Sequence, residues 1–287
     1  MTDLLSIFEY QFFRHALATA ILISLLAAMA GTYIVSRKIV FIGGGITHAS
    51  FGGIGMAYYL GINPFAGAAV FAVGTALGIE WISQKGKVRE DSAIAILWSL
   101  GMAIGIIFVF ITPGYTPNLM SFLFGSILSV GMGDIYLLIA AVLIVLACVL
   151  VFYRPILYTA FDPEFAKVMG LPVAAFRYLM AIIIALAIVI SIRSIGIILV
   201  LSMFTIPQIT AMLFTQNFAR IIPLAALWGI TGSVAGLLAA YVLDIPSAAS
   251  IIFFLSIQFL TIKTFLFIKK QIKHPWRRSR PFGNRIF

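Results

Sequence analysis

One segment of the chain joins a histidine to a high density of small residues. It runs from Phe41 to Gly61 and reads FIGGGITHASFGGIGMAYYLG, with His48 near its centre. At helical spacing, the face that carries the histidine also holds Gly44, Gly52 and Met56. A neutral imidazole is the commonest protein ligand for zinc and similar ions, and small neighbours leave an ion room to pass. The segment therefore predicts a metal-binding step at His48.

A packing role is the alternative interpretation of the same segment. Small residues recur in it at every fourth position: Gly45, Ala49, Gly53 and Ala57. Such a face lets two membrane helices approach closely, and a histidine beside it is then a hydrogen-bonded packing residue. Both interpretations place the segment against other helices, within a bundle.

A second polar cluster lies in the apolar stretch GIILVLSMFTIPQITAML, which starts at Gly196. Its polar and kinking residues are Ser202, Thr205, Pro207, Gln208 and Thr210. Pro207 cannot donate a backbone hydrogen bond, so the helix should kink there and leave a carbonyl free. Either the hydroxyl groups satisfy that kink, or the cluster lines a path through the protein. The candidate lining residues of such a path are Gly44, Thr47, Gly52 and Gln208.

The segment 154–172 has the signals of a short capped helix. Asp162 is followed by Pro163 and Glu164, a combination typical of a helix N-terminus, and Gly170 predicts the end of the helix. The large apolar residues between these signals recur at helical spacing: Phe161, Phe165 and Val168. Such a helix either lies on the bilayer surface or fits a cytoplasmic partner.

These residues lie in or between nine apolar segments, each long enough to cross a hydrocarbon core of about 30 Å as a helix. The segments are 15–35, 39–61, 62–83, 93–112, 134–153, 173–192, 195–214, 221–243 and 247–268. In lipid every backbone polar group must pair internally, which favours helices. The predicted fold is all-α, a polytopic membrane helix bundle of eight or nine transmembrane helices.

The basic residues assign an orientation to this bundle. Of the 19 Lys and Arg residues, all but Arg14 and Arg193 fall on one side of the predicted topology. Basic loops stay in the cytoplasm, so the N-terminus is predicted outside and the C-terminus inside. The chain then divides into an extracytoplasmic leader at 1–14, a transmembrane domain at 15–268 that includes the cytoplasmic segment 154–172, and a basic cytoplasmic tail at 269–287. This pattern fits the inner membrane of a bacterium, with lipid as a partner.

The composition argues against several classes of protein. Hydrophobic residues make up 62% of the chain and charged residues 10%, far from the composition of soluble globular proteins. The net charge of +10 reflects the cytoplasmic loops and tail, so no nucleic-acid partner is expected. The single Cys148 rules out an intrachain disulfide framework. Acidic residues avoid the middle of the spans, so uphill transport needs an energy source other than coupled protons or sodium ions.

Two classes of membrane protein can be weighed against the sequence: a secondary transporter or channel that acts alone, and an enzyme embedded in the membrane. The first would show carboxylates at mid-membrane and an internal inverted repeat. The second would need a constellation such as H-E-x-x-H, and His48 has no acidic residue or second histidine near it in the sequence. Neither signature is clear, and co-purification with an ATPase would argue against both classes.

Four motifs, in order along the chain, carry a resemblance to a known family. They are the segment from Phe41, the stretch LMSFLFGSIL from Leu119 that is too short to span, the loop AFDPEFAKVMGLP, and the proline segment IPQITAMLFT. Together they resemble the membrane subunit of the ATP-binding-cassette importers for zinc, manganese or chelated iron, from residue 15 to residue 268. The resemblance implies a homodimeric permease with two cytoplasmic ATP-binding subunits and an extracytoplasmic metal-binding protein.

The resemblance also implies that the loop is a coupling helix that fits a cleft in the ATPase. Its coupling residues would be Asp162, Pro163, Glu164, Phe165, Gly170 and Leu171. The sequence holds no phosphate loop of the GxxxxGK[ST] type. ATP hydrolysis is therefore expected on a separate subunit, and the chain is expected to be no enzyme and to bind no cofactor of its own.

The sequence departs from the family at one position of the segment from Phe41. The family usually has an aspartate four residues before the histidine, and here that position is Gly44. A carboxylate suits oxygen-preferring ions such as manganese, whereas imidazole without it suits zinc. The expected cargo is therefore a divalent metal ion, zinc first and manganese next, with chelated iron as the alternative.

Overall fold

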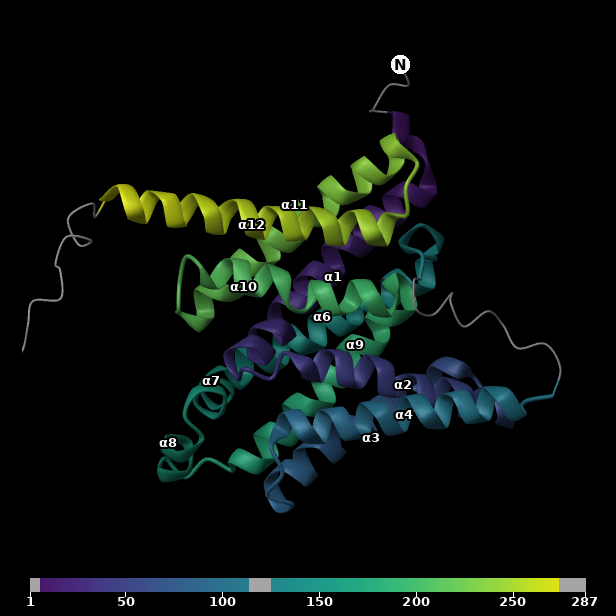
Figure 1. Ribbon diagram of the computed structural model, residues 1–287, viewed down its shortest axis with the longest axis vertical. Helices are drawn as coiled ribbons and strands as arrows, with labels where there is room; N and C mark the ends of the chain where they lie inside the picture. The colour runs from purple at the N-terminus through teal and green to yellow at the C-terminus, as the bar shows by residue number, and fades with distance from the viewer. Residues whose placement is uncertain (1–5, 114–124, 274–287) are drawn as a thin grey trace, which may run out of the picture.

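The computed structural model describes residues 6–113 and 125–273, and within them the regular elements are helices without a strand (Figure 1). The long helices are α1 (Gln11–Ser36), α2 (Phe41–Leu60), α3 (Pro64–Lys85), α4 (Glu90–Ile111), α6 (Met132–Val151), α9 (Val173–Met203), α11 (Phe218–Leu243) and α12 (Ser247–Lys273). The short ones are α7 (Tyr153–Phe161), α8 (Pro163–Val168), α10 (Ile206–Met212) and the 3₁₀ turns η1 (Ser6–Glu9) and η2 (Ile127–Ser129). The predicted all-α class is confirmed. Parts of the predicted leader, of the short outer stretch from Leu119 and of the basic tail lie outside the described residues.

Seven of the described helical segments are long and apolar enough to cross a membrane, as the predicted polytopic bundle requires. Helix α2 is not among the seven, because its glycines and His48 lower its hydropathy. It is nevertheless 20 residues long and packs against α3, α4 and α9 inside the bundle. Because α2 is surrounded by protein, it does not need the apolar side chains that contact with lipid requires.

Small residues bring α2 into backbone contact with its neighbours. A Cβ atom added at Gly53 would collide with the carbonyl oxygen of Gly67 on α3. A Cβ atom at Gly101 of α4 would lie 2.5 Å from the Cα atom of Ala49. Membrane helices approach this closely only where side chains are absent or small. The predicted packing face of the segment is therefore confirmed, and it holds α2 in a fixed position between α3 and α4.

Helix α1 runs through the middle of the bundle, between α6 and α11 (Figure 1). Its residues from Leu26 to Val35 are all buried. They include three alanines and one glycine, which allow close packing on several sides at once. The hydrophobic core of the described chain is thus built around α1, with α2 and α9 beside it.

Helix α9 is divided by a sharp break at Gly196. This residue has φ 77° and ψ 169°, a combination that is open to glycine and strained for other residues. A Cβ atom on Gly125 would lie 2.6 Å from the carbonyl carbon of Ile195, so the turn is packed closely by the chain before η2. The break separates the predicted spans 173–192 and 195–214.

Ion pairs and ring contacts show that the chain reverses direction at this break. Arg177, in the first turns of α9, pairs with Glu80 at the end of α3. Arg193 pairs with Asp134 at the opposite end of the bundle, where α6 begins. Beyond α10, Phe218 again lies beside the short helix α7, where its ring contacts Phe161. The chain therefore crosses the bundle and returns, as the two predicted segments require.

The region between α6 and α9 differs from the prediction of one short helix. Helix α6 ends at Val151, and α7 follows almost directly from Tyr153 to Phe161 before α8 begins. Pro155 lies in the first turn of α7, where its missing N–H group leaves no bond unmade. Helices α7 and α8 project together at one edge of the molecule (Figure 1).

Candidate translocation site

His48 lies at the middle of α2, and its ring stacks on Trp98 of α4. The ring centroids are 4.5 Å apart and the planes differ by 7°. The histidine is only partly buried, in contrast to its neighbours Thr47 and Ala49. Its Nδ1 atom is buried and has no hydrogen-bond partner. An unpaired imidazole nitrogen in the interior is costly, and binding an ion, or a water molecule, is one way to satisfy it.

The other candidate residues on α2 lie close to His48. Gly44 is one turn earlier, and a Cβ atom there would be 3.2 Å from the Cζ3 atom of Trp98. Thr47 is fully buried, and its hydroxyl group donates a hydrogen bond of 2.8 Å to the carbonyl oxygen of Gly44. Gly52 is one turn later, and a Cβ atom there would lie 2.7 Å from the carbonyl oxygen of Gly101. The structure thus brings these three residues to one stretch of α2, next to α4.

Gln208 occupies a different place. Its Nε2 atom donates hydrogen bonds of 2.7 Å to the carbonyl oxygen of Ala27 and 3.2 Å to that of Met203. The second of these carbonyls lies in the kink before Pro207, so the side chain satisfies a group that the proline leaves free. Its Oε1 atom is buried without a partner. These bonds connect α10 to α1 and α9, and a role in the path remains a prediction.

The described residues contain no group of three or more His, Cys, Asp and Glu side chains that could hold a metal ion. Within the part of the chain seen here, His48 is therefore a single imidazole without other strong ligands nearby. A closed site of four ligands would retain its ion, whereas a transport step requires weak binding. A single imidazole is a weak ligand set compared with such a closed site.

A buried ionic network, which sequence reasoning did not find, closes the bundle at the end near α8. Arg37 donates a hydrogen bond of 2.6 Å to Glu80 and also pairs with Glu90, while Arg177 contacts both carboxylates. The side chains of Arg37 and Glu80 are 5% and 2% exposed. The only signal in the sequence was that these charges stand at the ends of predicted spans.

The charge of Arg37 is fixed by its surroundings. Burial acts to lower the pKa of the guanidinium group, but the nearby Tyr33, Glu80 and Glu90 raise it by more, so the pKa lies above its ordinary value. Arg37 therefore stays protonated at any physiological pH. Because two arginines meet two glutamates, the network joins the ends of α1, α3, α4 and α9 without a net charge.

The coupling segment has the local geometry that was predicted from its capping residues. The Oδ1 atom of Asp162 accepts a hydrogen bond of 2.9 Å from the backbone N–H of Phe165, and Pro163 follows it as the first helical residue. At the other end, Gly170 has φ 76°, and Leu171 donates its backbone N–H to the carbonyl oxygen of Ala166. This is the bonding pattern of a glycine-terminated helix.

Helix α8 presents its side chains outward. Phe165 is 46% exposed and Val168 is 85% exposed. Glu164 pairs with Lys167 on the exposed side of the helix, at 2.7 Å. Below it, the rings of Tyr158 and Phe165 meet edge to face, with centroids 5.5 Å apart. The helix therefore rests on α7, and Phe165 and Val168 form an apolar surface that the described residues leave exposed.

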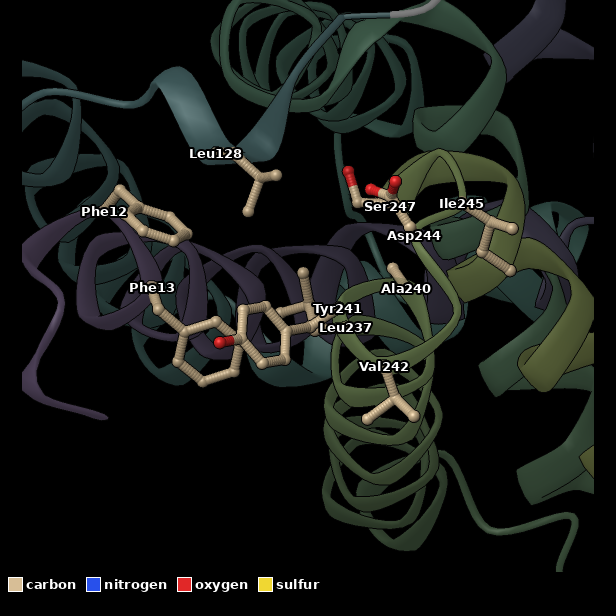
Figure 2. Close-up of a pocket in the computed structure, with 10 residues that line it drawn as sticks. All are labelled: Phe12, Phe13, Leu128, Leu237, Ala240, Tyr241, Val242, Asp244, Ile245 and Ser247. Carbon is tan, nitrogen blue, oxygen red and sulfur yellow. The ribbon is translucent and has the colours of Figure 1, made fainter. Parts of the chain in front are cut away.

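A cavity of about 680 Å³ (Figure 2) lies near the start of α1, at the opposite end of the molecule from α8 (Figure 1). It is lined by side chains from the start of α1, from η2 and from the connection between α11 and α12: Phe12, Phe13, Leu128, Leu237, Ala240, Tyr241, Val242, Asp244, Ile245 and Ser247. The lining is largely apolar, with one carboxylate at its rim in Asp244. It does not include His48, so the cavity and the histidine are separate features.

Comparison with known proteins gives a consistent set of relatives. Residues 9–266 match the ABC 3 transport family. The chain is 35% identical over 274 residues to the manganese transport system membrane protein MntC of Halalkalibacterium halodurans, with 95% of this chain and 93% of the relative covered. It is 33% identical over 252 residues to the manganese import system permease protein ScaB of Streptococcus gordonii, with 88% and 90% covered. The solved structure of PsaBC from Streptococcus pneumoniae in complex with Fab superposes with a TM-score of 0.78 at 31% identity, over 90% of this chain and 92% of that one.

Proposed function

The chain belongs to the ABC 3 transport family, and on this basis we propose that it forms the membrane path of an ATP-driven importer of divalent metal ions in the cytoplasmic membrane of a bacterium. The observation that carries the proposal is His48, a partly exposed imidazole with an unpaired nitrogen in the middle of a buried, glycine-rich helix. Ionisable groups inside a membrane bundle are costly and mark pathways.

Manganese and zinc are the two candidate cargoes, and each has its own support. The relatives in Halalkalibacterium halodurans and Streptococcus gordonii carry names that specify manganese. The site itself offers an imidazole with glycine at position 44, and imidazole without a carboxylate suits zinc better than manganese. The transported ion is the substrate of the chain and not a resident cofactor.

The energy and the other subunits come from outside this chain. The sequence lacks a phosphate-binding loop, so hydrolysis of ATP falls to two cytoplasmic subunits that dock on α8. A second copy of the chain would complete the permease and bring a second His48 to the path. An extracytoplasmic binding protein would deliver the ion to the outer end. These partners are part of the proposal, and the exposed apolar surface of α8 supports the first of them.

The mechanism that follows is alternating access. The ion enters from the outer end, exchanges part of its water shell for the imidazole of His48, and leaves toward the end closed by the Arg37 and Glu80 network. Binding at a single imidazole per chain is weak enough for release. Movement of α8 with the ATPases would be passed to α9, which follows it directly and carries Arg177 of the network.

The test is uptake of radiolabelled zinc and manganese by cells that express the chain with its ATPase and binding protein. His48→Ala should reduce uptake of the transported ion by about tenfold or more, because the ligand in the path is lost. His15→Ala is the matched control, since the Nδ1 atom of His15 lies 3.1 Å from the carbonyl oxygen of Val130 and is not unpaired. An assembled complex that takes up neither metal would reject the proposal in favour of a chelated iron or another substrate.

A further inference from the structure

The partner of His48 is an aromatic ring and not a hydrogen-bonding group. A histidine that binds a metal is usually oriented by a carboxylate or carbonyl that accepts its second N–H. Here the indole of Trp98 lies parallel to the imidazole at 4.5 Å, and Nδ1 has no partner. The stack covers one face of the ring. It fixes the plane of the imidazole while leaving its nitrogen atoms uncommitted.

The same indole closes the space beside Gly44. A Cβ atom at Gly44 would lie 3.2 Å from Cζ3 and 3.5 Å from Cη2 of Trp98, and 3.8 Å from a methyl group of Leu201. The position one turn before His48, from which a side chain could share an ion with the imidazole, is therefore bordered by apolar atoms. An ion at His48 meets a nitrogen ligand beside an apolar wall.

The place of Trp98 is set by the close packing of α4 on α2. Gly101 lies three residues after Trp98, on the next turn of α4, and it allows the backbone of α4 to touch Ala49 next to His48. Any larger side chain at position 101 would separate the helices and with them the two rings. The close helix contact thus places the backbone of Trp98 where its indole can stack on the imidazole.

We propose that Trp98 is a positioning and selectivity residue for the transported ion. It holds the imidazole plane of His48 and fills the space above Gly44, so that an ion is held by nitrogen and by water and not by a second oxygen ligand from α2. Such a site favours ions that imidazole binds well, of which zinc is the relevant one, over oxygen-preferring manganese. The proposal rests on the proposed function, since it assumes that a metal ion passes His48.

The test compares the ratio of zinc to manganese uptake among variants of the full transporter in cells, corrected for the amount in the membrane. Trp98→Leu and Trp98→Met remove the flat ring and should lower zinc uptake by about tenfold, with a lower zinc-to-manganese ratio. Trp98→Phe keeps an aromatic plane and should retain most of the ratio. Trp81→Leu is the matched control, because Trp81 is 57% exposed on α3.

A second arm asks whether the indole excludes an oxygen ligand. Gly44→Asp alone should gain little manganese uptake, because its side chain meets the indole. Gly44→Asp combined with Trp98→Leu should shift uptake toward manganese. An unchanged metal ratio in the Leu, Met and combined variants would overturn the role of Trp98. Failure of the unaltered transporter to take up either metal would instead reject the proposed function.

Discussion

Among single residues, Arg37 and Glu80 carry opposite charges into the interior of the bundle. Removing such groups from water is costly, and the cost is offset only where each charge has partners at hydrogen-bonding distance. Glu80 uses one carboxylate oxygen for Arg37 and the other for Arg177. Removing Glu80 would therefore leave both guanidinium groups short of a partner, one of them fully buried.

We predict that Glu80→Ala lowers the free energy of unfolding by about 3–5 kcal/mol, the usual cost of breaking a buried ion pair. The loss would appear as a lower melting temperature of the purified protein in detergent. Asp91→Ala is the matched control, because Asp91 pairs with Arg89 at the surface, where the two side chains are 56% and 85% exposed. Its effect should stay within about 1 kcal/mol. Equal melting temperatures for the two variants would contradict a structural role of the network.

At this scale the sequence predicts some residues and not others, for physical reasons. His48 could be found because a histidine in a long apolar segment is unusual in itself. Trp98 could not, because a tryptophan in an apolar span is ordinary and only the packing of α4 on α2 brings it to the imidazole. Glu80 stands near the end of a predicted span, but its partners Arg37 and Arg177 come from the end of α1 and from α9, which the sequence does not show to be neighbours.

At the scale of elements, α8 is short enough that its caps decide whether it forms. Six residues make few internal hydrogen bonds. The side chain of Asp162 and the turn at Gly170 therefore supply much of the stability of this helix. The helix stands between α7 and α9 and leads directly into the helix that holds Arg177. Loss of a cap would loosen this element without disturbing the spans.

We predict that Asp162→Ala uncouples ATP hydrolysis from transport while the protein still assembles. The lost cap costs about 1 kcal/mol locally, which is enough to fray a helix of this length. The measurement is metal uptake per ATP hydrolysed in the reconstituted transporter, which should fall. Asn63→Ala is the control: Asn63 caps α3 with a hydrogen bond of 2.9 Å to the N–H of Phe65, at the other end of the bundle. If Asp162→Ala left the metal uptake per ATP hydrolysed unchanged, or if Asn63→Ala lowered it equally, α8 would not be the coupling element.

Sequence reasoning at this scale succeeds where hydropathy or capping decides. The spans and the ends of α8 follow from the bilayer thickness and from Asp162 and Gly170, and the structure agrees. Helix α7 was missed because its sequence, YRPILYTAF, is short and has no side-chain cap at its start. The reversal at Gly196 was predicted only as a gap between two segments, because the φ of a glycine cannot be inferred from its neighbours.

At the scale of the whole molecule, charge is distributed unequally between the two ends of the bundle. The end near α8 holds the Arg37 and Arg177 network and Lys167. At the other end, Arg193 is matched by Asp134 at 2.5 Å and its guanidinium carbon lies 4.8 Å from the centre of the Phe65 ring. Arg193 is thus neutralised by its partner, so its place at the end opposite α8 does not oppose the rule that keeps free basic residues in the cytoplasm.

We predict that the end with α8 is cytoplasmic and the end with Asp134 faces outward. A chain in which Cys148 is replaced by alanine can carry one new cysteine at either end. Gly133→Cys suits the outer end, because Gly133 is exposed and a Cβ atom there meets nothing within 4 Å. Met169→Cys suits the inner end, because Met169 is 59% exposed beside α8. A maleimide that cannot cross membranes should label the first in intact cells and the second only after permeabilisation.

The two cysteines control for each other, since each shows that the reagent and the protein are intact when the other is not labelled. The parent chain without Cys148 should remain unlabelled in both conditions, and uptake of metal by all three variants would show that they are folded. The reverse labelling pattern would place α8 outside the cell, where no ATP-binding subunit could reach it. That outcome would contradict the proposed ATP-driven importer, because cytoplasmic ATP-binding subunits could not contact the exposed face of α8.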